Sequence, residues 1–157
     1  MLPFVLVIDQ DFFLQENHDS FIFSHYTDSN KEIICKGGFL LAENKVFKIG
    51  RLRLIDDFPL ALHTSFVTKS TFPEIEKDGP DMTSMFQYYR QHGFVEFGSS
   101  TCTLNVIFPT LFERDILQCS SLIPLLQVES LCRDKRSNQV LEHTVKIYRS
   151  DCFTYVI

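Results

Sequence analysis

The sequence predicts an α+β domain built on one antiparallel sheet. Two stretches of the chain each consist of a strand, a tight turn and a second strand, which is the pattern of antiparallel neighbours. Short helices with capping residues are interspersed with these hairpins, and no regular strand–helix–strand alternation of a parallel sheet is present. The length of 157 residues suits a single domain, and a hydrophobic content of 45% suffices for one sizeable core.

Elements of the first half can be assigned in order. Residues 1–18 carry a weak pattern and are interpreted as a lead-in segment to a domain that spans 19–157. A β-prone, alternating stretch predicts a strand over 19–27. A short helix over 31–36 is favoured by the Ser-Asn pair before it and the glycine pair after it.

The first hairpin follows. Its strands are expected over residues 45–55 and 60–67, with the pair Asp56-Asp57 and Pro59 marking the turn. Because side chains alternate along a strand, the first strand should place one group of residues together on one face. These residues are Phe47, Ile49, Arg51, Arg53 and Ile55.

A loop over residues 68–80 should separate the first hairpin from a helix. Asp81 or Thr83 would cap this helix, which should run through His92, with Gly93 just past its end. Met82, Met85, Phe86 and Tyr89 form its apolar stripe.

The second half begins with a strand over residues 94–107. Thr110 and Glu113 then have the spacing of a capping box, which predicts a helix over 110–119. The second hairpin and a final apolar strand complete the fold. These strands are expected over residues 124–132, 140–148 and 152–157.

Charge and cysteine content narrow the class of protein. With a net charge of −5 and no cluster of Lys or Arg, the chain is a poor candidate for binding nucleic acid by itself, because affinity for DNA comes mainly from Lys and Arg contacts to phosphates. The five cysteines are scattered, with no pair at metal-binding or redox spacing, so reduced thiols and no metal or cofactor are expected. No apolar run approaches the roughly 20 residues of a membrane span. A cytoplasmic protein without membrane contact is therefore predicted.

Two groups of polar residues are candidates for a binding site. Arg51 and Arg53 share a strand face with apolar residues, and a buried guanidinium needs a partner. That partner is either a phosphate or carboxylate ligand, which suits two neighbouring forks, or an internal Asp or Glu. Glu142, Thr144 and Tyr148 share a face of another strand. They either hold ligand hydroxyls or form part of an ordinary sheet surface.

Three segments in order resemble one known family. They are VFKIGRLRLIDDFPLALHTSFV (46–67), FPEIEKDGPDMTSMFQYYRQHGF (72–94) and IPLLQVESLCRDKRSNQVLEHTVKIYRSDCFTYVI (123–157). Together they resemble the UTRA domain, the effector-binding half of GntR/HutC-family bacterial transcriptional regulators. The resemblance covers residues 19–157. It implies a chorismate lyase-like fold, a ligand cleft, a homodimer, and DNA contact only through an N-terminal winged helix-turn-helix domain that this chain lacks.

The resemblance also implies an effector site and marks departures from the family pattern. It assigns Arg51, Arg53, Glu142 and Tyr148 to the site, with Thr144 beside them. Ser84 matches the serine that opens the central helix; it would either offer its hydroxyl to an anion or serve only as a helix cap. Phe86 replaces a tyrosine, which favours a less polar contact.

His63 stands where the family has an acid. It would either face the cleft or be a neutral histidine of the core or the surface. As the effector, the resemblance implies a small anionic metabolite such as a phosphorylated sugar.

The leading prediction is a sensor domain and not an enzyme. One alternative is a chorismate lyase-like enzyme that uses Arg51 and Glu142, although the segments 110–119 and 124–128 follow the regulator pattern. The other alternative is a stand-alone small-molecule-binding module that never carried a DNA-binding domain.

Overall fold

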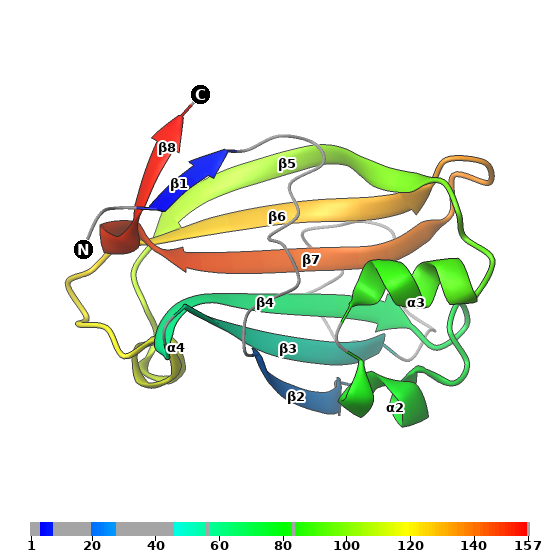
Figure 1. Cartoon of the computed structure of the whole chain (residues 1–157), viewed down its shortest axis with the longest axis horizontal. Helices are drawn as coiled ribbons and strands as arrows, with labels where there is room; N and C mark the ends of the chain where they lie inside the picture. The colour runs from blue at the N-terminus through cyan, green and yellow to red at the C-terminus, as the bar shows by residue number, and fades with distance from the viewer. Residues whose placement is uncertain (1–3, 8–19, 28–45, 56, 83, 157) are drawn as a thin grey trace.

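A six-stranded antiparallel sheet forms the centre of the molecule (Figure 1). The computed structural model describes residues 4–7, 20–27, 46–55, 57–82 and 84–156. The strand order is β2-β3-β4-β7-β6-β5, so two three-stranded units meet at the β4–β7 pair. The sheet and its helices confirm the predicted α+β class. The strands are β2 (Ser20–Thr27), β3 (Val46–Ile55), β4 (Phe58–Thr68), β5 (Phe97–Ile107), β6 (Leu125–Asp134) and β7 (Val140–Arg149).

The first hairpin, β3–β4, is confirmed with one change at its turn. Asp57 adopts a left-handed backbone with φ of 61°, a conformation that aspartate tolerates. Strand β4 already begins at Phe58, so Pro59 lies in the strand rather than in the predicted turn. Pro59 sits opposite Leu54, where the register shifts between Arg53 and Leu54. Irregularities of this kind are where a strand accepts a proline.

Helices α3 (Met85–Gln91) and α4 (Leu111–Leu117) confirm two of the predicted helices. The cap of α3 is Ser84, whose hydroxyl accepts a hydrogen bond from the Gln87 backbone amide at 3.3 Å, and not Asp81 or Thr83. The predicted capping box of α4 is present in full, because the Thr110 and Glu113 side chains each bond the other's backbone amide.

The predicted loop over 68–80 holds a helical turn that the sequence pattern missed. Helix α2 (Ile75–Asp78) is followed by the 3-10 turn η1 (Gly79–Asp81). The four residues of α2 are too few for helical periodicity, and the Gly-Pro pair of η1 is typical of a loop. Ile75 is fully buried, so tertiary packing fixes the turn.

A second, two-stranded sheet joins the two ends of the described chain. Strand β1 (Phe4–Val7) pairs in parallel with β8 (Phe153–Val156), which follows the 3-10 turn η2 (Ser150–Cys152) (Figure 1). The expectation of a single antiparallel sheet is therefore wrong in this detail. The predicted helix over 31–36 lies outside the described residues.

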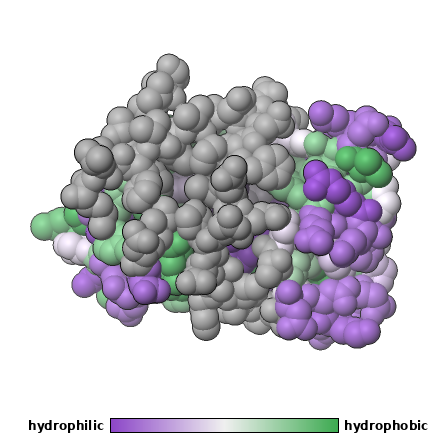
Figure 2. All heavy atoms as spheres, in the orientation of Figure 1, coloured by the Kyte–Doolittle hydropathy of each residue, from purple (hydrophilic) through white to green (hydrophobic). Residues whose placement is uncertain are grey.

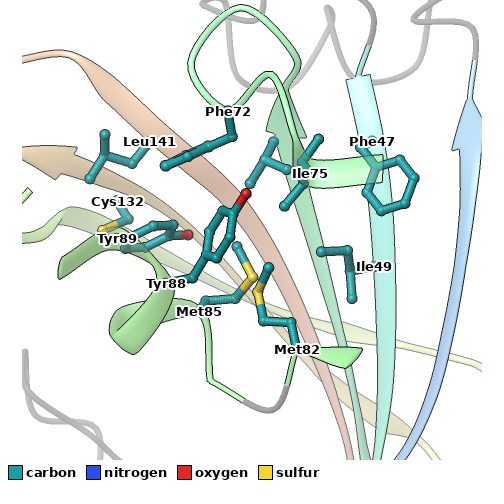
Figure 3. Packing of buried hydrophobic residues seen from close by; sticks show 11 residues of the cluster. Phe47, Ile49, Phe72, Ile75, Met82, Met85, Tyr88, Tyr89, Cys132 and Leu141 are labelled. Carbon is teal, nitrogen blue, oxygen red and sulfur yellow. The ribbon is translucent and has the colours of Figure 1, made fainter. Parts of the chain in front are cut away.

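Each face of the main sheet carries its own core. On one face, Phe47 and Ile49 of β3 pack with Phe72 and with Met85 and Tyr89 of α3 (Figure 3). On the other face, Leu117 of α4 packs with sheet residues; these are Leu62, Leu125 and Ile147. Met85, Phe86 and Tyr89 of the predicted stripe lie on α3, with Phe86 at the margin of the first core. Met82 packs in the same core but lies before the helix.

The surface differs between the two ends of the molecule. Figure 2 shows hydrophilic residues gathered at the end that carries α2 and α3. Toward α4, several large apolar side chains are exposed: Phe108, Leu111, Phe112 and Leu122. Among the described residues, no helix has the length and apolar character that crossing a membrane requires.

Candidate functional site

Strand register brings most of the predicted site residues onto one face of β3, β4 and β7. Arg51 lies opposite His63, and His63 lies opposite Lys146, so these three residues form a row across three strands. The next row holds Arg53, Ala61 and Tyr148. Cross-strand partners project to the same side of a sheet. We call this surface, defined by Arg51, Arg53, His63, Lys146 and Tyr148, the arginine face.

Arg51 is buried on this face, with only 6% of its surface exposed. Its Nη2 donates a hydrogen bond to Ser65 Oγ at 2.9 Å, while its buried Nε has no hydrogen-bond partner. Within the described ranges no carboxylate pairs with Arg51. The alternative, an internal ion pair between Arg51 and an Asp or Glu, is therefore not formed in that part of the chain. A buried guanidinium in this state is set to receive an acceptor.

His63 is buried beside Arg51 and makes an edge contact with Tyr148, at 5.6 Å between ring centroids. Its Nε2 is buried and has no hydrogen-bond partner. Burial lowers the pKa of His63 well below its usual value, and the positive charges of Lys146, Arg53 and Arg51 lower it further. The imidazole is therefore neutral near pH 7.

Glu142 provides a carboxylate on the same side of β7. It is 4% exposed, and its Oε2 accepts a hydrogen bond from the Tyr89 hydroxyl of α3. Burial raises the pKa of Tyr89 above its usual value, and the Glu142 carboxylate raises it further. Tyr89 therefore remains a protonated donor. This bond connects α3 to the sheet and fixes the orientation of one Glu142 oxygen.

Thr144 lies between Glu142 and Lys146 on the same face. It is buried and sits opposite Ser65 on β4 and Ser130 on β6. Ser65 is thus the hydrogen-bond acceptor for Arg51 and the cross-strand neighbour of Thr144. Small hydroxyl side chains at these positions form the polar floor of the arginine face beside Arg51.

No described contact links Ser84 to the arginine face, and the described contact that links Phe86 to it is an edge contact with Tyr89, at 6.0 Å between ring centroids. Ser84 caps α3 and lines a surface groove with residues of α2 and η1, among them Lys77 and Asp81. Phe86 stacks on Phe97, with ring centroids 5.1 Å apart. These contacts explain both residues as parts of the scaffold, and their effector roles stay predictions.

Three residues of the site were missed by sequence reasoning. Lys146 and Ser65 could have been found, because each follows its predicted neighbour at an interval of two along a strand. Tyr89 was assigned only to the apolar stripe of α3. Its hydrogen bond to Glu142 depends on how the helix docks on the sheet, which no local pattern encodes.

The described part of the chain contains no candidate metal site. No group of three His, Cys, Asp or Glu side chains there could hold an ion. Cys132 is buried opposite Glu142, and burial raises the pKa of its thiol to about 12. A thiol of that pKa is a packing residue and not a nucleophile near neutral pH.

The arginine face has the chemistry of an anion receptor. Among the described residues, Arg51, Arg53 and Lys146 place three cationic side chains on it, with the carboxylate of Glu142 on the same side. The sheet and its helices define a domain of the α+β class, and the arginine face is its candidate ligand site.

Comparison with known proteins assigns the family. The family model of the UTRA domain matches residues 22–154, and the chain belongs to the UTRA domain family. The resemblance seen in the three sequence segments is thereby confirmed.

Solved structures of GntR-family effector domains share the fold. The effector domain of PhnF from Mycobacterium smegmatis superposes with a TM-score of 0.73 at 16% identity, covering 87% of this chain and 83% of that one. A GntR-family transcriptional regulator from Bacillus cereus gives 0.73 at 20% identity, with coverages of 88% and 96%. The C-terminal domain of the histidine utilization repressor from Pseudomonas syringae gives 0.69 at 16% identity, with coverages of 86% and 93%. The predicted chorismate lyase-like fold is confirmed.

Proposed function

We propose that this chain is the ligand-sensing domain of a GntR/HutC-type transcriptional regulator and that a small anionic metabolite binds on the arginine face. The observation that carries the proposal is Arg51, a buried guanidinium whose Nε has no hydrogen-bond partner among the described residues. A buried donor left unsatisfied is costly, so such a group is retained where a ligand completes it.

The effector's acidic group would lie at Arg51 and Arg53, which are two residues apart on one strand face. Two guanidinium forks at this spacing suit a phosphate or a carboxylate. Glu142 and Thr144, on β7, would accept or exchange hydrogen bonds with hydroxyl groups of the same molecule. A phosphorylated sugar combines these two kinds of group and is our specific candidate.

Sensing would proceed by a shift between arrangements of the whole regulator. The effector can move this equilibrium only by as much as its affinities for the two arrangements differ. We place the domain in a cytoplasmic homodimer that touches DNA only through a separate winged helix-turn-helix domain. The similarity in fold to the effector domain of PhnF and to a GntR-family regulator supports the sensor role.

We propose binding rather than catalysis. Glu142, the carboxylate that a lyase would use, is buried and already held by Tyr89. Incubating the protein with chorismate and assaying 4-hydroxybenzoate checks this point. Formation of 4-hydroxybenzoate that depends on the protein would replace the sensor assignment with an enzymatic one.

A thermal-shift screen against sugar phosphates, amino-sugar phosphates and small carboxylic acids tests the proposal. A ligand at about 100 times its Kd stabilises the folded state by about 2.7 kcal/mol. For a domain of this size that corresponds to a rise in Tm of roughly 5–10 °C. The same screen is run on Arg51→Ala and on Arg136→Ala, whose exposed side chain lies in the β6–β7 turn and pairs with Glu96 at 3.0 Å.

The expected result is a concentration-dependent rise in Tm that persists in Arg136→Ala and is lost in Arg51→Ala. A ligand that binds Arg51→Ala as tightly as the wild type would place the effector site elsewhere. No rise with any compound of the screen would contradict the anion site.

A further inference from the structure

We infer that Lys146 is a specificity-determining contact of the effector site and that the effector carries two acidic groups. The inference rests on the proposed function, because it assumes that the arginine face is the effector site. It assigns a residue that the resemblance did not point to, and it narrows the ligand from an anion to a doubly acidic molecule.

Strand geometry separates the cations into two centres. Arg51 and Arg53 lie along β3, whereas Lys146 lies on β7, with His63 of β4 between them in the same row. Neighbouring strands are about 4.8 Å apart, so the backbones of Arg51 and Lys146 are separated by roughly 10 Å. An acidic group held by the arginine pair leaves the ammonium of Lys146 for a second acidic group.

Charge balance points the same way. Within the described residues, neither Arg51 nor Lys146 has a carboxylate within ion-pair distance. Glu142 lies four residues before Lys146 on the same strand face, but its Oε2 accepts the Tyr89 hydroxyl. Arg51 and Lys146 lie on strands separated by β4, so each of these partly or fully buried cations can receive its own anionic group of one ligand.

His63 fits between the two acidic groups of such a ligand. Its neutral imidazole adds no charge to the row, and its buried Nε2 has no hydrogen-bond partner. Depending on the tautomer, Nε2 can donate to an anion or accept from a hydroxyl that links the two acidic ends. A carboxylate at this position would instead repel a second acidic group.

The charged groups around Lys146 suit a second anionic group of the ligand beside it. Burial lowers the pKa of Lys146, and Arg51 and Arg53 lower it further, while Glu142 acts in the opposite direction. A ligand carboxylate beside the ammonium would favour its charged form.

Isothermal titration calorimetry on matched pairs of ligands tests the inference. One pair is glucitol 6-phosphate and 6-phosphogluconate, which are both open-chain; the other is butanoate and succinate. Each pair differs chiefly in the second acidic group. The proteins are the wild type, Lys146→Met, Arg51→Ala and the control Lys135→Met, which changes an exposed lysine of the β6–β7 turn.

We expect the doubly acidic member of at least one pair to bind the wild type at least tenfold more tightly than its partner. Lys146→Met should reduce this preference to less than threefold, because it weakens binding of the doubly acidic member more than binding of the singly acidic one. Lys135→Met should keep the preference, and Arg51→Ala should weaken both members. Lys146→Met should also melt no lower than the wild type without ligand, because replacing a partly buried, unpaired cation by an apolar side chain is seldom destabilising.

Each contrary result has its own meaning. Equal affinities within both pairs, or a preference that survives in Lys146→Met, would overturn the inference. If Arg51→Ala abolished binding in either of these cases, the proposed anion site would stand and only the inference about Lys146 would fail. Failure of all four ligands to bind the wild type would overturn the inference and the proposed function together.

Discussion

Replacing Tyr89 with phenylalanine removes the single hydroxyl that connects α3 to the carboxylate of Glu142. Tyr89 is fully buried and Glu142 is 4% exposed, so water cannot substitute for the lost donor without disrupting the core. A hydrogen bond to a charged group contributes about 1.5–3 kcal/mol. We therefore expect Tyr89→Phe to lower the free energy of unfolding by about 2 kcal/mol, which is roughly 4–8 °C in Tm.

The adjacent residue is a matched control. The Tyr88 hydroxyl also donates to a carboxylate, Asp78 Oδ2 at 3.1 Å, but Asp78 is half-exposed. Water can replace that donor, so Tyr88→Phe should cost less than about 1 kcal/mol. Urea denaturation gives both values, and the m-value should be the same in all three proteins if only stability has changed.

The pH dependence gives a second check on Tyr89. Because the folded-state pKa of Tyr89 is raised, its contribution to stability is complete below the unfolded pKa of about 10 and is lost as the pH rises above it. The wild type should lose more stability than Tyr89→Phe between pH 9 and pH 11. If Tyr89→Phe were no less stable than Tyr88→Phe, the hydrogen bond to Glu142 would not contribute as argued.

Two further predictions concern the scaffold. Arg149→Lys should cost about 1 kcal/mol in urea denaturation, because lysine cannot reproduce the guanidinium fork that bonds both carboxylate oxygens of the solvent-exposed Asp151 at 3.1 and 2.8 Å. The bond lowers the pKa of Asp151, so this contribution should be present above pH 4 and fade as the pH falls through the lower folded-state pKa; a penalty equal at pH 3 and pH 7 would contradict it. Gly79→Ala should destabilise by roughly 1–3 kcal/mol, because its Cβ would come within 2.6 Å of the Phe47 ring. Gly98→Ala meets only a flexible lysine side chain and should change Tm much less, so equal shifts for the two glycines would refute the packing argument.

Local pattern explains most of the fold, and long-range packing explains what the pattern missed. The two hairpins and the capping box of α4 follow from alternation and from pairs of residues three apart. Helix α2 is too short for periodicity, and its position depends on the burial of Ile75. The pairing of β1 with β8 joins segments nearly 150 residues apart, and no local signal records such a contact.

The candidate site divides in the same way. Alternation predicts that Arg51 and Arg53 share one face of β3 and assigns Glu142 to one face of β7. It does not predict that β4 pairs with β7 and so brings these two faces to the same side of the sheet. Lys146 shares its face with Glu142 by the same alternation, yet it belongs to no motif that would single it out. The unpaired nitrogens of Arg51 and His63 are visible only once every neighbour is in place.

The β4–β7 junction has a consequence for how the regulator matures. Each three-stranded unit is continuous in sequence, whereas the row from Arg51 to Lys146 crosses the boundary between the units. Contacts between distant segments form slowly, and a chain leaves the ribosome from its N-terminus. The proposed effector site therefore cannot form until β7 has been synthesised and has docked. An effector bound at this site would hold the two units together, so it should protect the amides of β4 and β7 from hydrogen exchange more than those of the outer strand β5.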